Sequence, residues 1–313
     1  MEWNDEGLEA AIRHITEIPE GDIMLSDVWE KKKMFISGDI VINDLSAICE
    51  LTNISELYFY KIKVSDYSPL SKLPNLKSLA CEYSFASDEA MLSVLSINQL
   101  TLLRFAADIN TSKQLKMLQF GKLENLENLS VKLDEICLEN IKGLNKAKTL
   151  SIRTHGYGYL SKDFPKFCDI FSKMSALEGL SLFQGVFDIS PIEKLTNITS
   201  LNISEMKFMD VSCLSNLTNL ESLTLKGDKI TDITPLSSLT NLKRLNLCQN
   251  KITNVKPLAG LTNLEMLVLQ YNQIIDVSPL LSLTKLEHLD VSDNNISDES
   301  VFSQFPDSVE IKH

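Results

Sequence analysis

The chain has 313 residues, of which 44% are hydrophobic and only 7% aromatic, and this length fits either two ordinary globular domains or one elongated array. Its formal net charge of -12 argues against binding to a phosphate backbone, which needs concentrated lysine and arginine. Lys31, Lys32 and Lys33 form a basic run that is too short to reverse this balance. Composition therefore predicts a partner other than nucleic acid.

The first residues precede any repeat and predict two helices. Apolar residues recur at helical spacing over residues 8–15, and a Pro- and Gly-containing segment at 19–22 ends this helix. A shorter helix over residues 25–29 has Ser26 as its candidate N-cap. We assign residues 1–28 to a helical cap that covers the first strand of an array, and a separate small helical domain is the alternative.

Degenerate copies of a 22-residue repeat begin near Trp29. If Trp29 opens the first copy, Phe35 takes a buried strand position, although Lys32 then stands where a leucine is expected. Residues 51–72 form a regular copy in which Leu57 occupies the corresponding buried position. The register of the first copy is therefore predicted by counting 22 residues back from Leu51, where the regular copy begins.

The copies within residues 73–143 are irregular in length. A return segment that starts at Ser87 predicts a capped helix, and a second helix is expected over residues 112–120. Leu103 and Phe105 are the predicted buried strand pair between these helices. We therefore expect helices on the outer side of the array in this region.

The copy that opens at Leu144 is the longest, and it contains an insertion over residues 153–173. Asp163 and Pro165 predict the start of a helix. Its residues at helical spacing predict a face that packs on the array. These residues are Phe164, Phe167, Cys168 and Phe171.

A loop precedes this helix and consists of His155, Gly156, Tyr157, Gly158 and Tyr159. Two glycines between aromatic residues predict a mobile loop, and loops on a rigid scaffold are frequent binding sites. We interpret it as a partner-contacting loop, with a packing role for the insertion as the alternative.

The four most regular copies cover residues 217–304 and have the sequences LTNLESLTLKGDKITDITPLSS, LTNLKRLNLCQNKITNVKPLAG, LTNLEMLVLQYNQIIDVSPLLS and LTKLEHLDVSDNNISDESVFSQ. Leucine recurs at copy positions 1, 4 and 7, and Leu or Val at position 9. A fixed period with this pattern is typical of a leucine-rich repeat solenoid. Position 12 is Asp228, Asn250, Asn272 and Asn294.

Within one copy, apolar positions 7 and 9 alternate with mostly polar positions 6, 8 and 10, which predicts a short strand with one buried face. The Asn or Asp at position 12 ends the strand and predicts a ladder of such side chains along the stack. No copy can bury its own leucines, so each must stack on its neighbours.

The predicted fold class is α/β, a right-handed leucine-rich repeat solenoid shaped as a curved horseshoe, with a parallel sheet on its concave side. We expect mixed 3-10, α-helical and extended segments on the convex side. About twelve repeats are expected over residues 29–304, irregular at 73–173. Residues 305–313 add a C-terminal strand or cap, with Phe302 and Phe305 over the exposed end.

Two parts of the chain resemble bacterial internalin-like leucine-rich repeat proteins of the 22-residue class. Residues 7–28, GLEAAIRHITEIPEGDIMLSDV, resemble the helical cap of these proteins, and residues 195–304 resemble their repeats. The resemblance implies recognition of another protein on the concave face, without catalysis. No export signal, cell-wall anchor or trailing domain is visible in the sequence, which argues against host-cell adhesion.

The concave face is the predicted binding surface. About twelve strands at ~4.8 Å spacing and ~17 Å length give ~900 Å², close to the ~800 Å² that one partner contributes to a standard interface. Tyr and Arg are frequent interface anchors, although each candidate could also be a scattered surface residue. The candidates are Tyr58, Tyr60, Tyr83, Arg104, Arg153, His155, Tyr157, Tyr159, Phe183, Arg244, Tyr271 and His288.

No catalytic constellation, cofactor motif or metal-ligand pattern is found in the sequence, so we expect a protein that is not an enzyme and needs no cofactor. The histidines His14, His155, His288 and His313 fall in separate segments. Cys248, at position 10 of its copy, is expected to be an outward-facing free thiol.

Two hypotheses for function follow. The first is a cytoplasmic protein-binding scaffold, an inhibitor or immunity-type partner of another protein, present as a monomer or a weak end-to-end dimer. Six cysteines scattered singly suit a reducing compartment, and neither a signal peptide nor a membrane-spanning segment is recognised. The second is a secreted adhesion or virulence module whose signal was removed and which binds a host surface protein or glycan.

Overall fold

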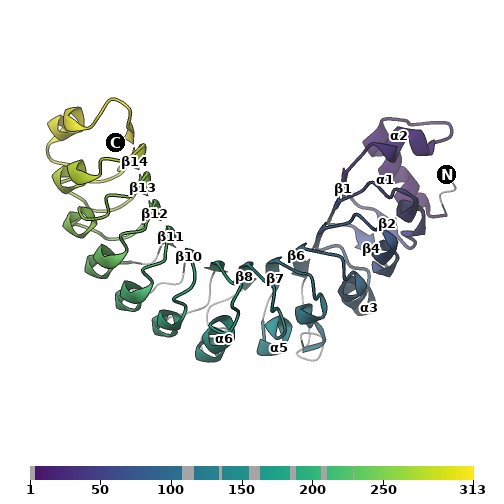
Figure 1. Cartoon of the computed structure of the whole chain (residues 1–313). Helices are drawn as coiled ribbons and strands as arrows, with labels where there is room; N and C mark the ends of the chain where they lie inside the picture. The colour runs from purple at the N-terminus through teal and green to yellow at the C-terminus, as the bar shows by residue number, and fades with distance from the viewer. Residues whose placement is uncertain are drawn as a thin grey trace. The chain divides into compact units, whose positions relative to one another are not determined.

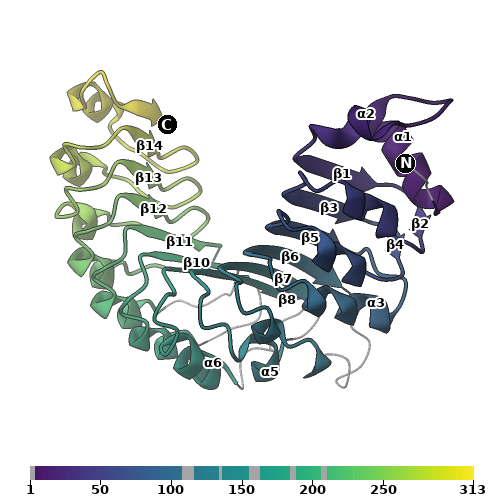
Figure 2. The ribbon, with the colours of Figure 1, turned by 45° about the vertical axis from the view of Figure 1, so that its right-hand side comes forward.

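The computed structural model describes residues 4–107, 116–133, 136–154, 163–183, 188–205, 210–227 and 229–313. The chain splits into two compact units, residues 1–151 and 152–313, and we describe each by itself. In each unit, short parallel strands follow one another in sequence order, and helices or 3-10 turns lie behind them (Figures 1 and 2). The predicted leucine-rich repeat solenoid is therefore present in both units.

The first unit contains the helical cap and the irregular copies. Its helices and 3-10 helices are α1 (Glu6–Thr16), α2 (Leu25–Trp29), η1 (Ser46–Glu50), η2 (Ser68–Lys72), α3 (Asp88–Ser93), η3 (Val94–Ser96), η4 (Phe120–Lys122) and α5 (Leu138–Ile141). Its strands are β1 (Lys33–Ser37), β2 (Val41–Ile42), β3 (Glu56–Tyr60), β4 (Lys63–Val64), β5 (Ser78–Glu82), β6 (Leu102–Ala107) and β7 (Asn128–Leu133), and β8 (Thr149–Thr154) spans the boundary.

The second unit contains the regular copies, in which 3-10 turns replace most helices. Its helical elements are α6 (Phe164–Phe171), η5 (Ser190–Lys194), η6 (Ser212–Asn216), η7 (Thr234–Ser238), η8 (Lys256–Leu258), η9 (Ser278–Ser282) and η10 (Glu299–Gln304). Its strands are β9 (Gly179–Phe183), β10 (Ser200–Ser204), β11 (Ser222–Lys226), β12 (Arg244–Asn246), β13 (Met266–Val268), β14 (His288–Asp290) and β15 (Glu310–Lys312).

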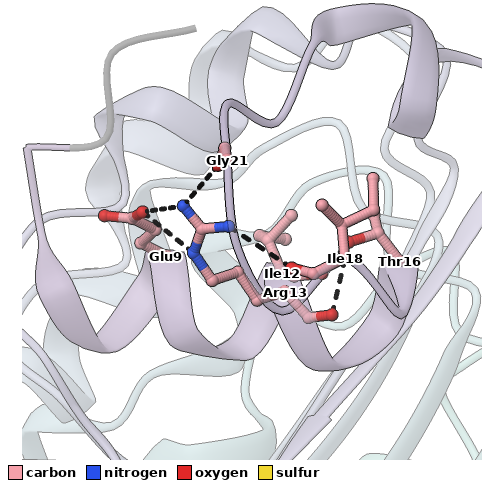
Figure 3. A network of polar contacts seen from close by, with 6 residues as sticks. All are labelled: Glu9, Ile12, Arg13, Thr16, Ile18 and Gly21. Carbon is pink, nitrogen blue, oxygen red and sulfur yellow. Dashed lines mark hydrogen bonds and ion pairs between the residues drawn. The ribbon is translucent and has the colours of Figure 1, made fainter.

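The N-terminal helices are present as predicted and pack on the first strands. The Asp5 carboxylate accepts hydrogen bonds from the backbone N–H of Leu8 (2.8 Å) and of Asn43 (2.7 Å), so one side chain caps α1 and ties it to the segment after β2. Arg13 binds Glu9 and the Gly21 carbonyl, which closes the turn after α1 (Figure 3). The cap is therefore held by polar contacts as well as by its buried apolar face.

The start of α2 differs from the prediction. Ser26 lies inside the helix, and the carboxylate of Asp27 accepts a hydrogen bond from the N–H of Met24 at 2.7 Å. Sequence reasoning placed the cap on the Ser side chain, whereas a residue in the first turn supplies it by bonding back to the preceding backbone.

The register of the first copy corrects a second prediction. Strand β1 pairs Met34 with Leu57 and Phe35 with Tyr58, so Phe35 points outward and is 59% exposed. Met34 and Ile36 are buried in its place. A shift of one residue along a strand exchanges its two faces, and the first copy is one residue longer than the count from Trp29 assumed.

The predicted asparagine ladder is confirmed for Asn250, Asn272 and Asn294. The amide of Asn272 donates to the carbonyls of Leu269 (2.8 Å) and Leu247 (2.9 Å), and its oxygen accepts from the N–H of Ile252 at 3.0 Å. Asn250 and Asn294 make the same three contacts in their own copies. Each of these side chains therefore joins two successive copies, through buried groups at Asn250 and Asn272 and through partly buried groups at Asn294.

Two predicted outer helices are confirmed. Helix α3 begins after Ser87, whose hydroxyl accepts a hydrogen bond from the N–H of Ala90 at 3.2 Å. Helix α6 begins after Asp163 as predicted, but the Asp163 carboxylate pairs with Lys166 at 2.6 Å instead of capping the helix. Of the helix expected over residues 112–120, residues 112–115 lie outside the described residues, Lys116 and Met117 are helical, and Phe120 begins the separate 3-10 helix η4. The predicted apolar face of α6 is buried, namely Phe164, Phe167, Cys168 and Phe171.

The final strand, β15, pairs with β14 and thus confirms the predicted C-terminal strand. Phe305 is buried, and the Phe302 ring stacks on the His313 ring with centroids 4.3 Å apart. These aromatic residues therefore contribute to the end of the second unit, as expected.

Candidate protein-binding face

The outward side chains of the sheet strands are the candidate site, and we call them the strand face of each unit. Inward positions of every strand hold the core, so the alternation of the strand directs the intervening side chains to solvent. The backbone positions of these outward side chains are set by the rigid parallel pairing beneath them. A surface of this kind recognises a partner through side-chain chemistry, with little backbone rearrangement.

Strands β1 and β3 carry an aromatic pair on the strand face of the first unit. The rings of Phe35 and Tyr58 lie 6.4 Å apart, and the Tyr58 hydroxyl donates to Glu56 Oε2 at 3.1 Å. Glu56 also pairs with Lys33 at 2.8 Å, which lowers the pKa of the Glu56 carboxyl and raises the pKa of Lys33. This exposed ion pair holds Tyr58 in place more than it stabilises the fold.

Two further tyrosines lie at the ends of strands β3 and β5. Tyr60 is 38% exposed, and the ammonium of Lys61 lies 5.2 Å from its ring centroid. Tyr83 has the Lys132 ammonium 5.2 Å from its ring centroid. These distances fit cation–π contacts, so both aromatic faces already have a cationic neighbour.

Arg104 is exposed on β6, in the same register as the aromatic pair. Tyr58 pairs with Ala80, and Ala80 pairs with Arg104, so two strand spacings, ~10 Å, separate the tyrosine from the arginine. Ala80 lies between them and has a short side chain, so the surface is lower there than at Tyr58 and Arg104. The first unit therefore presents Phe35, Tyr58 and Arg104 along one line of its strand face.

The strand face of the second unit is more polar. The Arg153 guanidinium lies 4.5 Å from the Phe183 ring centroid, which buries part of that ring under a planar cation. Arg244 is exposed, and His288 Nδ1 lies 3.2 Å from Glu310 Oε2. These predicted residues are on the strand face, but they do not form an aromatic row like that of the first unit.

Tyr271 lies beyond β13 and is 49% exposed. Its φ of 55° places it in the left-handed region, as do Lys61, Tyr83 and Gln249 at the same copy position. The loop candidates His155, Tyr157 and Tyr159 lie outside the described residues, so the structure does not test them.

Sequence reasoning missed Phe35 and gave little weight to Met266, which is 42% exposed on β13. Phe35 was assigned to the core because of the register error. No alternation in the sequence prevents this error, because Met34, Phe35 and Ile36 are three consecutive apolar residues.

The cysteines are free thiols, and the predicted exposure of Cys248 is wrong. Its short side chain lies near Lys226 and is only 7% exposed. Burial raises the pKa of Cys248, raises that of Cys168 and Cys213 to about 12, and raises that of Cys81 well above its ordinary value. None of these four thiols is activated as a nucleophile.

This burial predicts slow chemical modification of the folded protein. At pH 8, a water-soluble aromatic disulfide reagent is expected to modify Cys81, Cys168 and Cys213 far more slowly than the same residues in urea, because the thiolate is the reacting species. The measurement is the time course of thiol release, with the modified residues assigned by peptide mapping. Rapid modification of Cys168 in the folded chain would contradict the assigned burial.

Among the residues that the structure describes, no group of three or more His, Cys, Asp or Glu side chains is arranged to hold a metal ion. No helix in the same part of the chain has the length and apolar character needed to cross a bilayer.

Comparison with known proteins identifies the class. A family model described as Leucine Rich repeats (2 copies) matches residues 218–260, 240–280 and 262–304. A search of curated proteins found no match. The matched repeats and the parallel strands of the two units show the leucine-rich repeat fold.

Solved structures of other proteins share this fold. An internalin, inlF, of Listeria monocytogenes has a TM-score of 0.65 at 22% identity, covering 99% of this chain and 95% of that one. The Drosophila Toll–Spätzle complex has a TM-score of 0.56 at 18% identity, covering 87% of this chain and 37% of that one. A leucine-rich repeat protein of Leptospira interrogans has a TM-score of 0.44 at 17% identity, covering 95% and 100%.

Proposed function

We propose that this protein is a non-enzymatic recognition scaffold that binds a protein partner on its strand face. The observation that carries this proposal is the row of Phe35, Tyr58 and Arg104 in the first unit, with the exposed Tyr60 beside it. Tyr and Arg are enriched among the few residues that dominate interface energies. An exposed aromatic residue flanked by charged residues has the character of an interface anchor.

The scaffold is proposed to act inside the cell as an inhibitor or immunity-type partner. The support is the set of six free cysteines, since such thiols persist in a reducing compartment. A scaffold without catalytic groups of its own changes a partner's activity by occupying its surface. The partner is therefore expected to be a protein whose own activity falls when this chain binds.

The test is capture from lysates with matched baits, followed by binding measurements on the purified captured protein. Tyr58→Ala, Tyr60→Ala and Arg104→Ala are each expected to weaken binding about tenfold or more, corresponding to ~1.4 kcal/mol per truncation. The three side chains are half-buried or exposed, so thermal unfolding should change little. Lys72→Ala and Lys122→Ala, on η2 and η4 behind the sheet, are the matched controls.

The outcomes separate the hypotheses. Equal affinity for the wild-type chain and the Tyr58, Tyr60 and Arg104 variants would exclude this part of the strand face as the docking surface. Loss of the captured protein's activity on binding supports the inhibitor role. Capture of host surface proteins or glycans instead would favour the secreted adhesion alternative.

A further inference from the structure

The segment after each strand of the regular copies forms a second outward surface. In the copy 261–282, Tyr271, Gln273 and Ile275 are exposed, whereas Asn272 and Ile274 alternate with them and point into the protein. Over residues 273–275 this period of two is that of an extended chain with one buried face, so Gln273 and Ile275 lie on one side, and the exposed Tyr271 directly precedes them. The same alternation occurs at residues 249–253. It also occurs at residues 293–297, where the inward residues Asn294 and Ile296 are only half-buried. We call residues 249–253, 271–275 and 293–297 together the flank of the second unit.

The centre of the flank is apolar in one copy only. Tyr271 is 49% exposed and Ile275 is 53% exposed. The positions matching Tyr271 in the other regular copies are Gly227, Gln249 and Asp293, and those matching Ile275 are Thr231, Thr253 and Ser297. An exposed apolar pair in a row that is otherwise polar or glycine marks a contact surface.

The left-handed backbone at Tyr271 is shared with the rest of the repeat. Its φ is 55°, and Lys61, Glu205, Gln249 and Asp293 also have positive φ at the matching position. The conformation therefore comes from the repeat, and what distinguishes the copy 261–282 is the large side chain that it exposes at this position.

Opposite charges lie on the two sides of the apolar pair. The copy 239–260 contains four basic residues and no acidic residue, and Lys251 is its exposed cation on the flank. The copy 283–304 contains five acidic residues and one lysine. Its exposed acid on the flank is Asp293, whose Oδ2 accepts a hydrogen bond from Gln270 Nε2 at 3.3 Å. The flank is therefore basic, then apolar, then acidic along the stack.

We propose that the flank is the contact between two copies of this chain, related by a twofold axis that runs along residues 271–275. Rotation about this axis reverses the order of the copies, so Gln249 of each chain lies opposite Asp293 of the other. Lys251 lies two residues, ~7 Å, further along the chain, within reach of the same Asp293 through its long side chain. Neighbouring copies are spaced evenly at ~4.8 Å, so the basic and acidic rows are equally distant from the axis. Tyr271 and Ile275 then meet their own counterparts, as an isologous interface requires.

The charge pattern selects a second copy over an unrelated partner, because an unrelated partner would need the same sequence of charges in reverse. The dimer is expected to be weak, since a few neighbouring copies offer less than the ~800 Å² per partner of a standard interface. It is also expected to weaken with salt, because the paired charges are exposed. This contact uses the flank and leaves the strand face free.

The first test is sedimentation velocity of the full chain over a range of concentrations, at low salt and at about 0.5 M salt. Association is expected to rise with concentration and to fall at high salt. Tyr271→Gly and Ile275→Thr introduce the residues of matching positions in neighbouring copies, so the fold should accept them, and each should weaken association at least tenfold. Met266→Arg, a residue of the same copy on the strand face, is the control and should leave association unchanged.

The second test is charge reversal. Lys251→Glu and Asp293→Lys are each expected to weaken association at least tenfold, because like charges then face each other. An equimolar mixture of the two variants should associate again, and so should a chain that carries both changes. A wild-type chain that stays monomeric up to about 1 mM, association that is indifferent to Tyr271 and Ile275, or a mixture that fails to recover would overturn the proposal.

Discussion

Replacement of Asn272 by alanine is expected to lower the free energy of unfolding of the second unit by about 2–3 kcal/mol. The Asn272 amide satisfies the carbonyls of Leu247 and Leu269, and its oxygen satisfies the N–H of Ile252. All three contacts are buried. An alanine leaves the Ile252 N–H without this partner, at ~1–3 kcal/mol, whereas the carbonyls of Leu247 and Leu269 each keep one donor, from Asn250 and Asn294. The measurement is urea unfolding, with hydrogen exchange used to locate the loss.

Asn263→Ala is the matched control for this prediction. Asn263 also donates to a carbonyl of the preceding copy, that of Thr240 at 2.9 Å, but this contact is exposed. Water replaces a lost partner there, so a cost below ~1 kcal/mol is expected. Asn272→Asp keeps the acceptor for Ile252 but lacks the donors, and it should also destabilise strongly. Equal costs at positions 272 and 263 would show that the ladder does not join the copies.

Replacement of Gly7 by alanine is expected to destabilise the N-terminal cap by about 2–3 kcal/mol. A Cβ at this position would lie 1.9 Å from the carbonyl oxygen of Val41, a backbone atom that cannot move aside alone. Helix propensity favours alanine by ~1 kcal/mol, so the steric effect must exceed this gain. Helix α1 would shift from β2 and strain the contact between Asp5 and Asn43. Hydrogen exchange of residues 33–42 should rise along with the loss of stability.

Gly260→Ala provides the comparison. No atom lies within 4 Å of a Cβ built there, and the residue has no positive φ. The same substitution should therefore be neutral or should stabilise by about 0.5 kcal/mol through the unfolded chain. A Gly7→Ala protein as stable as the wild type would mean that α1 does not lie directly on the β2 backbone.

The regular copies were predictable because their local and global signals agree. Leu245 and Leu247, for example, are spaced as a strand requires, and Asn250 stands where the strand must end, so one pattern determines burial and hydrogen bonding together. The register of the strand in the first copy could not be predicted by counting residues along the 22-residue repeat. A single extra residue before Leu51 moves Phe35 from the core to the surface, and nothing short of the pairing with β3 reveals it.

The candidate site was predictable in part. Tyr58, Tyr60 and Arg104 were found by their place in the repeat, because outward positions follow from the strand period. Their contacts were not, since the ion pair of Lys33 and Glu56 joins side chains on different strands. Cys248 was misjudged for a related reason, because the burial of a short side chain depends on its neighbours in adjacent copies.

The sequence by itself determined the class of fold, the strand in each regular copy and the asparagine ladder, because the same pattern of buried and polar residues recurs in every regular copy. Only the tertiary structure decided the register of β1, the left-handed backbone at Tyr271 and the exposure of both Tyr271 and Ile275, with Gln273 between them, on one flank. These features arise from contacts between copies. A local pattern specifies which residues a copy must bury, whereas the stacking of neighbours decides which of the remaining residues reach the surface together.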